Sequence, residues 1–200
     1  MKLYILRHAE TEWNREDRIQ GQMDSAITAE GLRSIERMRI RLAAVPFDRC
    51  YTSDLKRARR TAEGLLKYRA VPIIEVEALR ELPLGSWEGM LFKDIQKDPL
   101  ARAYLKRPES YHRKDLMNFH DLYEKLEQFV RTVEASEDEH VLIVGHGVSI
   151  RGLFNVIEGV SVNHFWSRPI AESMGLGLCV YERGVWRVLR RADKKDGLSY

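Results

Sequence analysis

Two short apolar runs, far apart in the chain, each end close to a histidine. Residues 3–6 (Leu-Tyr-Ile-Leu) precede Arg7 and His8, and residues 141–144 (Val-Leu-Ile-Val) precede a Gly-His-Gly sequence centred on His146. A continuous apolar run of this length is typical of a strand buried on both faces, as in parallel sheets covered by helices. The two runs therefore favour a fold in which a buried sheet carries both histidines at the carboxyl ends of its strands.

The rest of the chain alternates between strand-like and helix-like patterns. Residues 47–53 and 73–76 are further strand candidates, and residues 176–181 and 185–189 suit a hairpin because a short Glu-Arg-Gly segment separates them. Apolar side chains at spacings of three and four predict amphipathic helices over residues 28–45, 55–68, 119–133 and 148–157. This alternation predicts an α/β fold: a three-layer sandwich with a mostly parallel central sheet, helices on both faces and an antiparallel edge near the C-terminus.

The length favours one domain, because a domain typically holds about 100 to 200 residues. We therefore expect a single domain over residues 1–200. The stretch around residues 90–118 is polar, contains Pro99 and Pro108 and lacks a long helical periodicity, which predicts a helical cover inserted into the domain. Sheets of this kind bind ligands at the carboxyl ends of their strands, where Arg7, His8 and His146 are expected.

Composition and charge indicate an ordinary globular protein. Apolar residues make up 44% of the chain, and the 33 Lys and Arg exceed the 30 Asp and Glu by only three, too few to predict a nucleic-acid partner. The apolar run near the amino terminus is far shorter than the roughly 7 to 15 residues of a signal peptide core or the about 20 of a spanning helix. Cys50 and Cys179 form no Cys-x-x-Cys pair. We expect a cytoplasmic protein with no membrane partner, and its oligomeric state stays open.

Four short motifs occur in order along the chain. They are LRHAETEWN at residues 6–14, SDLKRARRTA at 53–62, LRELPLGSWEG at 79–89 and GHG at 145–147. Together they resemble the motifs of the histidine phosphatase superfamily, also called the phosphoglycerate mutase-like family, and their joint occurrence is far more specific than any one of them. The resemblance spans residues 3 to about 180.

The chemistry of phosphoryl transfer agrees with this resemblance. A phosphate monoester carries about two negative charges near neutral pH and needs fixed cationic donors, and Arg7 and Arg57 offer planar forks that can each hold two oxygens. The resemblance implies that His8 is the nucleophile, forming a phosphohistidine, while Arg7, Arg57 and His146 stabilise the transferring charge. It also implies that Glu81 protonates the leaving oxygen and then deprotonates the attacking water.

Four further residues are expected to bind phosphate or substrate. Asn14 matches the family position that contacts phosphate through its amide, and Gln20 and Gly21 match the loop that follows. Gly147 is expected to offer a backbone donor at the start of a helix, where the helix dipole favours anions. The sequence contains neither a Gly-x-x-x-x-Gly-Lys phosphate loop nor a His-Glu-x-x-His metal motif, so we expect no metal and no cofactor.

Three functions are open at this point. The first is a metal-independent phosphomonoesterase acting on a small phosphorylated metabolite. The second is phosphotransfer of the cofactor-dependent phosphoglycerate mutase type, but those mutases are longer and continue the acid motif as Glu-Arg-x-Tyr-Gly, whereas this chain reads Glu-Leu-Pro-Leu-Gly from Glu81. The third is a non-catalytic phosphate-binding protein, which is disfavoured by the joint retention of His8, Arg57, Glu81 and His146. The phosphatase is the favoured reading.

The sequence does not rank the small phosphorylated metabolites against one another. Aromatic and arginine side chains in or beside the expected cover are candidates for contacts with the organic part of a substrate, although packing and surface roles account for most of them. These side chains are Tyr104, Tyr111, Phe119 and Tyr123, with Arg102, Arg107 and Arg113.

Overall fold

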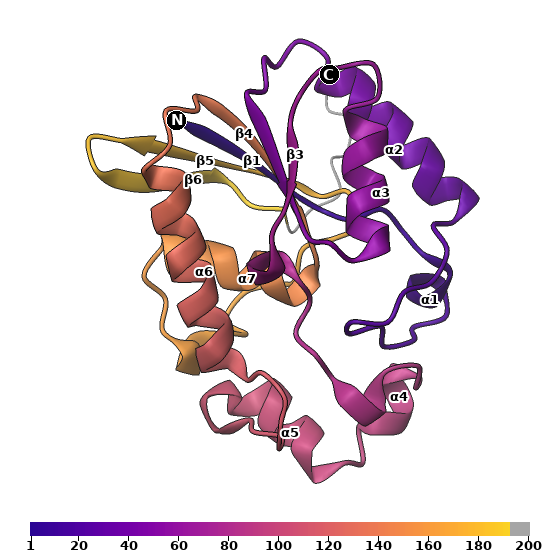
Figure 1. Ribbon diagram of the computed structural model, residues 1–200. Helices are drawn as coiled ribbons and strands as arrows, with labels where there is room; N and C mark the ends of the chain where they lie inside the picture. The colour runs from indigo at the N-terminus through magenta and orange to yellow at the C-terminus, as the bar shows by residue number, and fades with distance from the viewer. Residues whose placement is uncertain (193–200) are drawn as a thin grey trace.

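In the computed structural model, which describes residues 1–192, six strands form one sheet in the order β3-β2-β4-β1-β5-β6 (Figure 1). The strands are β1 (Lys2–Arg7), β2 (Arg49–Thr52), β3 (Ile73–Glu75), β4 (His140–Gly145), β5 (Leu176–Glu182) and β6 (Val185–Arg190). The pairs β1–β4, β4–β2 and β2–β3 are parallel, whereas β1–β5 and β5–β6 are antiparallel. The predicted α/β fold, with its mostly parallel sheet and antiparallel C-terminal edge, is confirmed.

Helices cover both faces of the sheet (Figure 1). The α-helices are α1 (Glu12–Arg15), α2 (Ala29–Arg41), α3 (Lys56–Leu65), α4 (Phe92–Ile95), α5 (Pro99–Lys106), α6 (Phe119–Glu134) and α7 (Gly147–Ile157). The 3-10 helices are η1 (Glu77–Leu79), η2 (Gly85–Trp87), η3 (Pro108–Ser110) and η4 (Val162–His164). Within residues 1–192, none of these helices has the length and apolar character that crossing a membrane requires.

The alternation of side chains along the strands produces two apolar cores. Leu3 and Ile5 of β1 belong to the core that contains α6 and α7, while Leu6 belongs to the core that contains α2 and α3. Successive side chains of a strand point to opposite faces, so a strand between two cores must be apolar at nearly every position. This requirement explains the continuous apolar runs, and each fully buried aliphatic side chain contributes about 1.5–3 kcal/mol.

The register of β1 and β4 brings the two histidines together. Arg7 pairs with Gly145 at the carboxyl ends of these parallel strands, and the backbone N–H of His8 donates to the Gly145 carbonyl at 2.9 Å. His8 and His146 therefore leave neighbouring strands at the same end of the sheet.

Element boundaries differ modestly from the predicted ones. The second helix ends at Arg41 rather than near residue 45, and β3 stops at Glu75. The hairpin between β5 and β6 turns on two residues, Arg183 and Gly184, whose φ angles of 53° and 78° lie in the left-handed region. That geometry matches a tight two-residue hairpin turn, which favours glycine at its second position.

The segment around residues 90–118 forms α4, α5 and η3, which lie together at the lower end of Figure 1. The Asp98 carboxylate accepts the backbone N–H of Leu100 at 2.9 Å and so caps α5. The indole N–H of Trp166 donates to the Tyr104 carbonyl at 2.5 Å, and the rings of Tyr104 and Trp166 lie 5.2 Å apart. Aromatic packing thus joins this segment to the rest of the molecule.

Candidate active site

His8 lies directly after β1 with its ring held in one tautomer. Its Nδ1 is 2.7 Å from the Ala9 carbonyl, a contact that requires a proton on Nδ1. Its Nε2 receives the Nε–H of Arg57 at 3.3 Å, so the lone pair lies on Nε2. Burial, aided by the charges of Arg57 and Arg7, lowers the pKa of His8 well below its usual range. The ring is therefore neutral near neutral pH and carries a lone pair suited to nucleophilic attack.

Arg57, on the first turn of α3, is 2% exposed although it belongs to a run of basic residues. Its Nη1 donates to the Met23 carbonyl at 2.6 Å and to Asp24 at 2.8 Å. Its Nη2 donates to the Gly21 carbonyl at 2.7 Å. The guanidinium is thus fixed between α3, the loop of residues 20–24 and the ring of His8.

Arg7 and His146 complete the set of side chains around His8. Arg7 donates through Nη1 to the Ala171 carbonyl at 2.8 Å. The rings of His146 and His8 lie 5.1 Å apart. Both ring nitrogens of His146 are buried and have no hydrogen-bond partner within residues 1–192, so the one N–H of the neutral ring can donate to an anion. Burial also lowers the pKa of His146 well below its usual range.

Glu81 reaches this site from the loop after η1. Its Oε1 accepts backbone N–H groups of Leu82, Val148 and Ser149 at 3.1, 3.1 and 3.2 Å, while its Oε2 accepts that of Val148 at 3.1 Å. Two of these donors belong to the first turn of α7, where backbone N–H groups have no partner within the helix. The contacts aim the carboxylate and leave Oε2 as its less engaged oxygen.

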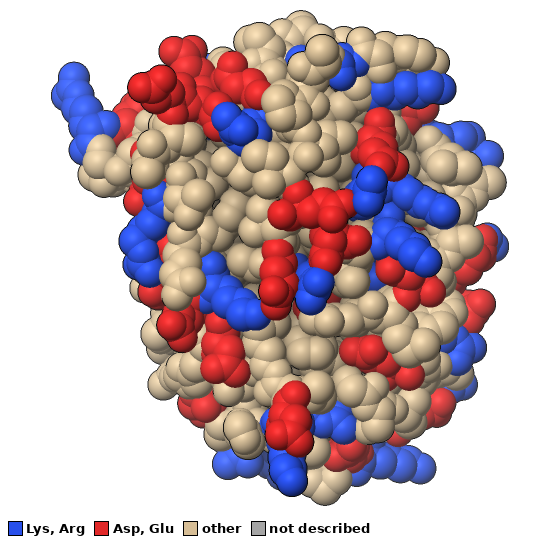
Figure 2. Space-filling model, viewed as in Figure 1, with Lys and Arg blue, Asp and Glu red and all other residues tan. Residues whose placement is uncertain are grey.

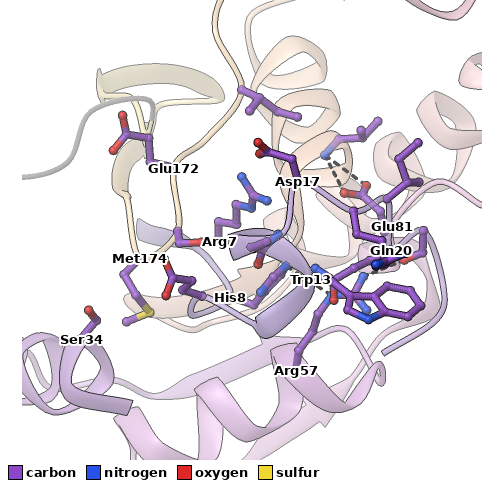
Figure 3. Close-up of a pocket in the computed structure, with 18 of the residues that line it drawn as sticks. Arg7, His8, Trp13, Asp17, Gln20, Ser34, Arg57, Glu81, Glu172 and Met174 are labelled. Carbon is purple, nitrogen blue, oxygen red and sulfur yellow. Dashed lines mark hydrogen bonds between the residues drawn. The ribbon is translucent and has the colours of Figure 1, made fainter. Parts of the chain in front are cut away.

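A cleft of about 1700 Å³ contains seven of the nine predicted site residues. Those residues are Arg7, His8, Asn14, Gln20, Gly21, Arg57 and Glu81. Figure 3 shows Arg7 and His8 at the end of β1, Arg57 rising from α3 and Glu81 approaching from another side. His146 and Gly147 do not line the cleft, although a Cβ added to Gly147 would lie 3.6 Å from Cζ of Arg7.

The predicted binding residues differ in what they present to the cleft. Asn14 accepts the backbone N–H and the hydroxyl of Thr11 at 3.1 and 3.0 Å through its Oδ1, which leaves the Nδ2 amide to donate to an anion. Gln20 accepts the Ser25 hydroxyl at 3.3 Å. Gly21 has a φ of +52°, a conformation that a side chain would strain.

Sequence reasoning missed several residues of the site. Asp24 is the ion-pair partner of Arg57, and it lies just after the predicted Gln20 and Gly21. Glu88 joins two loops and lies within the third motif. The spacing of these residues in the sequence does not predict these contacts. Glu172 lines the cleft without any motif to mark it. Of the aromatic and arginine candidates for substrate contact, Tyr104 lines the cleft and the other six do not.

The arrangement of possible metal ligands and the distribution of surface charge both concern ligand binding. Within residues 1–192, no group of three or more His, Cys, Asp and Glu side chains is arranged to hold a metal ion. On the face shown in Figure 2, basic and acidic side chains are interspersed. Local groups, not a broad field of one sign, therefore set the electrostatics on that face.

Comparison with known proteins gives consistent results. Phosphoserine phosphatase 1 of Hydrogenobacter thermophilus is 28% identical over 170 residues, covering 84% of this chain and 81% of that protein. The uncharacterized phosphatase PhoE of Bacillus subtilis is 31% identical over 156 residues, covering 78% of this chain and 76% of that protein. The solved structure of Bacillus stearothermophilus YhfR superposes with a TM-score of 0.89 at 34% identity, covering 97% of this chain and 98% of that one.

The model of one family matches nearly the whole chain. It is the histidine phosphatase superfamily (branch 1), and the match extends over residues 3–194. The resemblance seen in the four sequence motifs is confirmed, and this chain belongs to the histidine phosphatase superfamily.

Proposed function

We propose that this protein hydrolyses the phosphate monoester of a small metabolite through a phosphohistidine on His8, without a metal ion. The observation that carries the proposal is the state of the His8 ring. Its Nδ1–H is held by the Ala9 carbonyl, and its Nε2 lone pair faces Arg57 inside the cleft. A phosphoserine phosphatase among the relatives supports a small phosphorylated substrate.

In the first step, Nε2 of His8 attacks phosphorus in line with the leaving oxygen. The new N–P bond forms as the P–O ester bond breaks, and the leaving oxygen takes a proton from Glu81. Arg7, Arg57 and His146 surround the transferring group and stabilise its charge. The Nε–H of Arg57 points at Nε2 of His8, so it can donate to a phosphoryl oxygen as the N–P bond forms.

In the second step, water attacks the phosphorus of the phosphohistidine and Glu81 takes a proton from that water. A new P–O bond forms as the N–P bond breaks, which returns the lone pair to Nε2 of His8, restores the starting enzyme and releases inorganic phosphate. We assign proton transfer to Oε2 of Glu81 because Oε1 already accepts three backbone donors. Asn14, Gln20, Gly21 and Gly147 are proposed to hold phosphate or substrate. Nδ2 of Asn14 is the group of that side chain left to donate.

We also propose that the segment around residues 90–118 covers the cleft as part of a single domain over residues 1–200. Phe92, Ile95 and Tyr104 of this segment line the same cleft as His8, which supports the proposal. A cytoplasmic location is proposed as well. Cys50 and Cys179 are both unpaired and buried on opposite faces of the sheet, so neither needs an oxidising compartment.

The test is phosphate release from a panel of small phosphomonoesters in the presence of EDTA, with the His8→Ala variant in parallel. Wild type should release phosphate, His8→Ala should release none, and rapid acid-free quenching should detect covalent phosphate on wild type only. Substantial turnover by His8→Ala, or a requirement for a divalent metal, would overturn the mechanism. Isomerisation of 3-phosphoglycerate without release would assign a mutase, and phosphate binding without turnover would assign a binding protein.

A further inference from the structure

Two loops that carry parts of the site are bonded to each other along their backbones. The N–H of Ile19 donates to the Met90 carbonyl at 2.9 Å, and the N–H of Gly89 donates to the Ile19 carbonyl at 2.8 Å. The N–H of Phe92 donates to the Asp17 carbonyl at 2.9 Å. The loop before α2 and the loop that follows Glu81 thus run side by side up to the cleft.

The Glu88 carboxylate also joins the two loops, beyond the last of these backbone hydrogen bonds. Its Oε1 accepts the N–H of Leu84 at 2.9 Å, within its own loop, and the N–H of Gln22 at 3.1 Å, in the other loop. The Gln22 side chain in turn donates through Nε2 to the carbonyl of Glu81 at 3.2 Å. One carboxylate and one amide therefore connect the backbone of the proposed proton donor to the opposite loop.

The same carboxylate packs against the backbone that holds Arg57. A Cβ added to Gly21 would lie 2.2 Å from Oε1 of Glu88, so the two residues are in direct contact. The Gly21 carbonyl accepts Nη2 of Arg57 at 2.7 Å, and the Met23 carbonyl accepts Nη1 at 2.6 Å. Glu88 therefore contacts Gly21, whose carbonyl orients the guanidinium, and the adjoining Gln22 N–H.

We propose that Glu88 is a positioning residue that fixes the separation between the proton donor Glu81 and the phosphate-binding Arg57. The proposal rests on the function proposed above. Proton transfer requires the leaving oxygen to reach Glu81 while Arg57 holds the phosphoryl oxygens of the same substrate. A misplacement of about 1 Å in such an arrangement costs on the order of 10²-fold in rate.

The experiment compares Glu88→Ala, Glu88→Asp and Glu88→Gln with wild type on phenyl phosphate and p-nitrophenyl phosphate. Ser86→Ala is the matched control, because Ser86 lies in the same turn and its hydroxyl accepts from Arg113 on the exposed side. Glu88→Ala should lower kcat on phenyl phosphate by about 10²-fold and lower it less on p-nitrophenyl phosphate, whose leaving group needs little proton assistance. The ratio of the two rates does not depend on the fraction of enzyme that is folded.

The conservative variants separate positioning from folding. The Glu88→Gln amide oxygen can accept the same two N–H groups, so this variant should keep most of the activity, and Glu88→Asp, one methylene shorter, should show the same change of rate ratio as Glu88→Ala. The proposal is overturned if Glu88→Ala and Glu88→Asp keep the wild-type ratio, or if Glu88→Gln loses as much as Glu88→Ala.

A binding measurement tests the proposal about Glu88 even if the proposed hydrolytic function is wrong. If wild type hydrolyses no ester, the hydrolytic proposal fails, and calorimetry with inorganic phosphate tests Glu88 instead. Weaker phosphate binding by Glu88→Ala than by wild type and Ser86→Ala would support the positioning of Arg57. Equal binding by all three proteins would refute it.

Discussion

The proposed reactivity of His8 depends on which of its ring nitrogens holds the proton. The Ala9 carbonyl requires the proton on Nδ1, and the Nε–H of Arg57 requires the lone pair on Nε2, so two independent contacts select the same tautomer. Arg57 in turn is held by the Gly21 and Met23 carbonyls and by Asp24. At the scale of single residues, the site is pre-organised by acceptors that surround one guanidinium.

Replacing Arg57 by lysine tests this arrangement. Lysine offers a point charge without a planar fork, so it cannot satisfy the same acceptors and hold phosphate at once. We expect Arg57→Lys to lower kcat by about 10² to 10³-fold, the usual effect of removing one donor to a developing charge. Steady-state kinetics on p-nitrophenyl phosphate measures this, with Arg59→Lys on the exposed side of α3 as control. Nearly wild-type turnover by Arg57→Lys would contradict the proposed role of the planar guanidinium.

The role of Glu81 predicts a dependence on the leaving group. Glu81→Gln removes the proposed proton donor but keeps an oxygen for the backbone donors of α7. We expect it to slow phenyl phosphate much more than p-nitrophenyl phosphate, because the nitrophenolate leaves without much proton assistance. Glu77→Gln, an exposed ion-pair partner of Lys125, is the control. An equal loss on both esters would count against Glu81 as the acid.

At the scale of elements, the start of α7 organises both His146 and Glu81. The first-turn N–H groups of Val148 and Ser149 bind Glu81. The Ser149 hydroxyl accepts the N–H of His146 at 3.1 Å and donates to the Leu79 carbonyl at 3.0 Å, which ties the helix to η1. Ser149 is fully buried, so these bonds have no competition from water.

Removing that hydroxyl should therefore destabilise the fold. Ser149→Ala leaves a buried N–H and a buried carbonyl without their partner, which costs about 1–3 kcal/mol. Urea denaturation followed by circular dichroism measures the free energy of unfolding. Ser136→Ala, which loses one half-exposed bond to the Val133 carbonyl at the end of α6, should cost less. A Ser149→Ala variant as stable as Ser136→Ala would show that the bridge to Leu79 contributes nothing.

At the scale of the whole molecule, the two buried histidines make stability depend on pH. Burial lowers the pKa of His8 and His146 well below their usual range, so the unfolded chain binds protons at these positions before the folded chain does. The stability that arises from keeping them neutral is present above pH about 6.5 and is lost as the pH falls below that value. Carboxylates such as Glu30, whose pKa hydrogen bonds from Arg37 and Arg33 lower to about 2, lose their contribution only in more acidic solution.

We expect the free energy of unfolding to fall between pH 7 and pH 5.5, by up to about 1.4 kcal/mol per pH unit for each histidine. Urea titrations at several pH values measure the slope. His146→Gln should reduce it, while His120→Gln, at an exposed position, should leave it unchanged. A free energy of unfolding that stays constant over this pH interval would refute the inference that both histidines are buried in the neutral form.

Sequence patterns alone predict the sheet and its covering helices, and they place His8 and His146 at one edge of that sheet. Strand and helix patterns are local properties, and the positions of His8 and His146 followed from them because parallel strands end at one edge of a sheet. The motifs then pointed to Arg57 and Glu81, whose chemistry depends on residue type. These inferences needed no knowledge of distant contacts.

Only the packed structure shows which of the basic residues in α3 is buried and which groups hold it. Arg57 faces the cleft because that side of the helix turns toward the sheet, and its acceptors come from a loop more than 30 residues earlier in the chain. The Val148 N–H that aims Glu81 lies 67 residues away from it, and Glu88 meets Gln22 across a separation of 66. Such pairings depend on how loops approach one another after the helices and sheet have packed, and no local pattern encodes that approach.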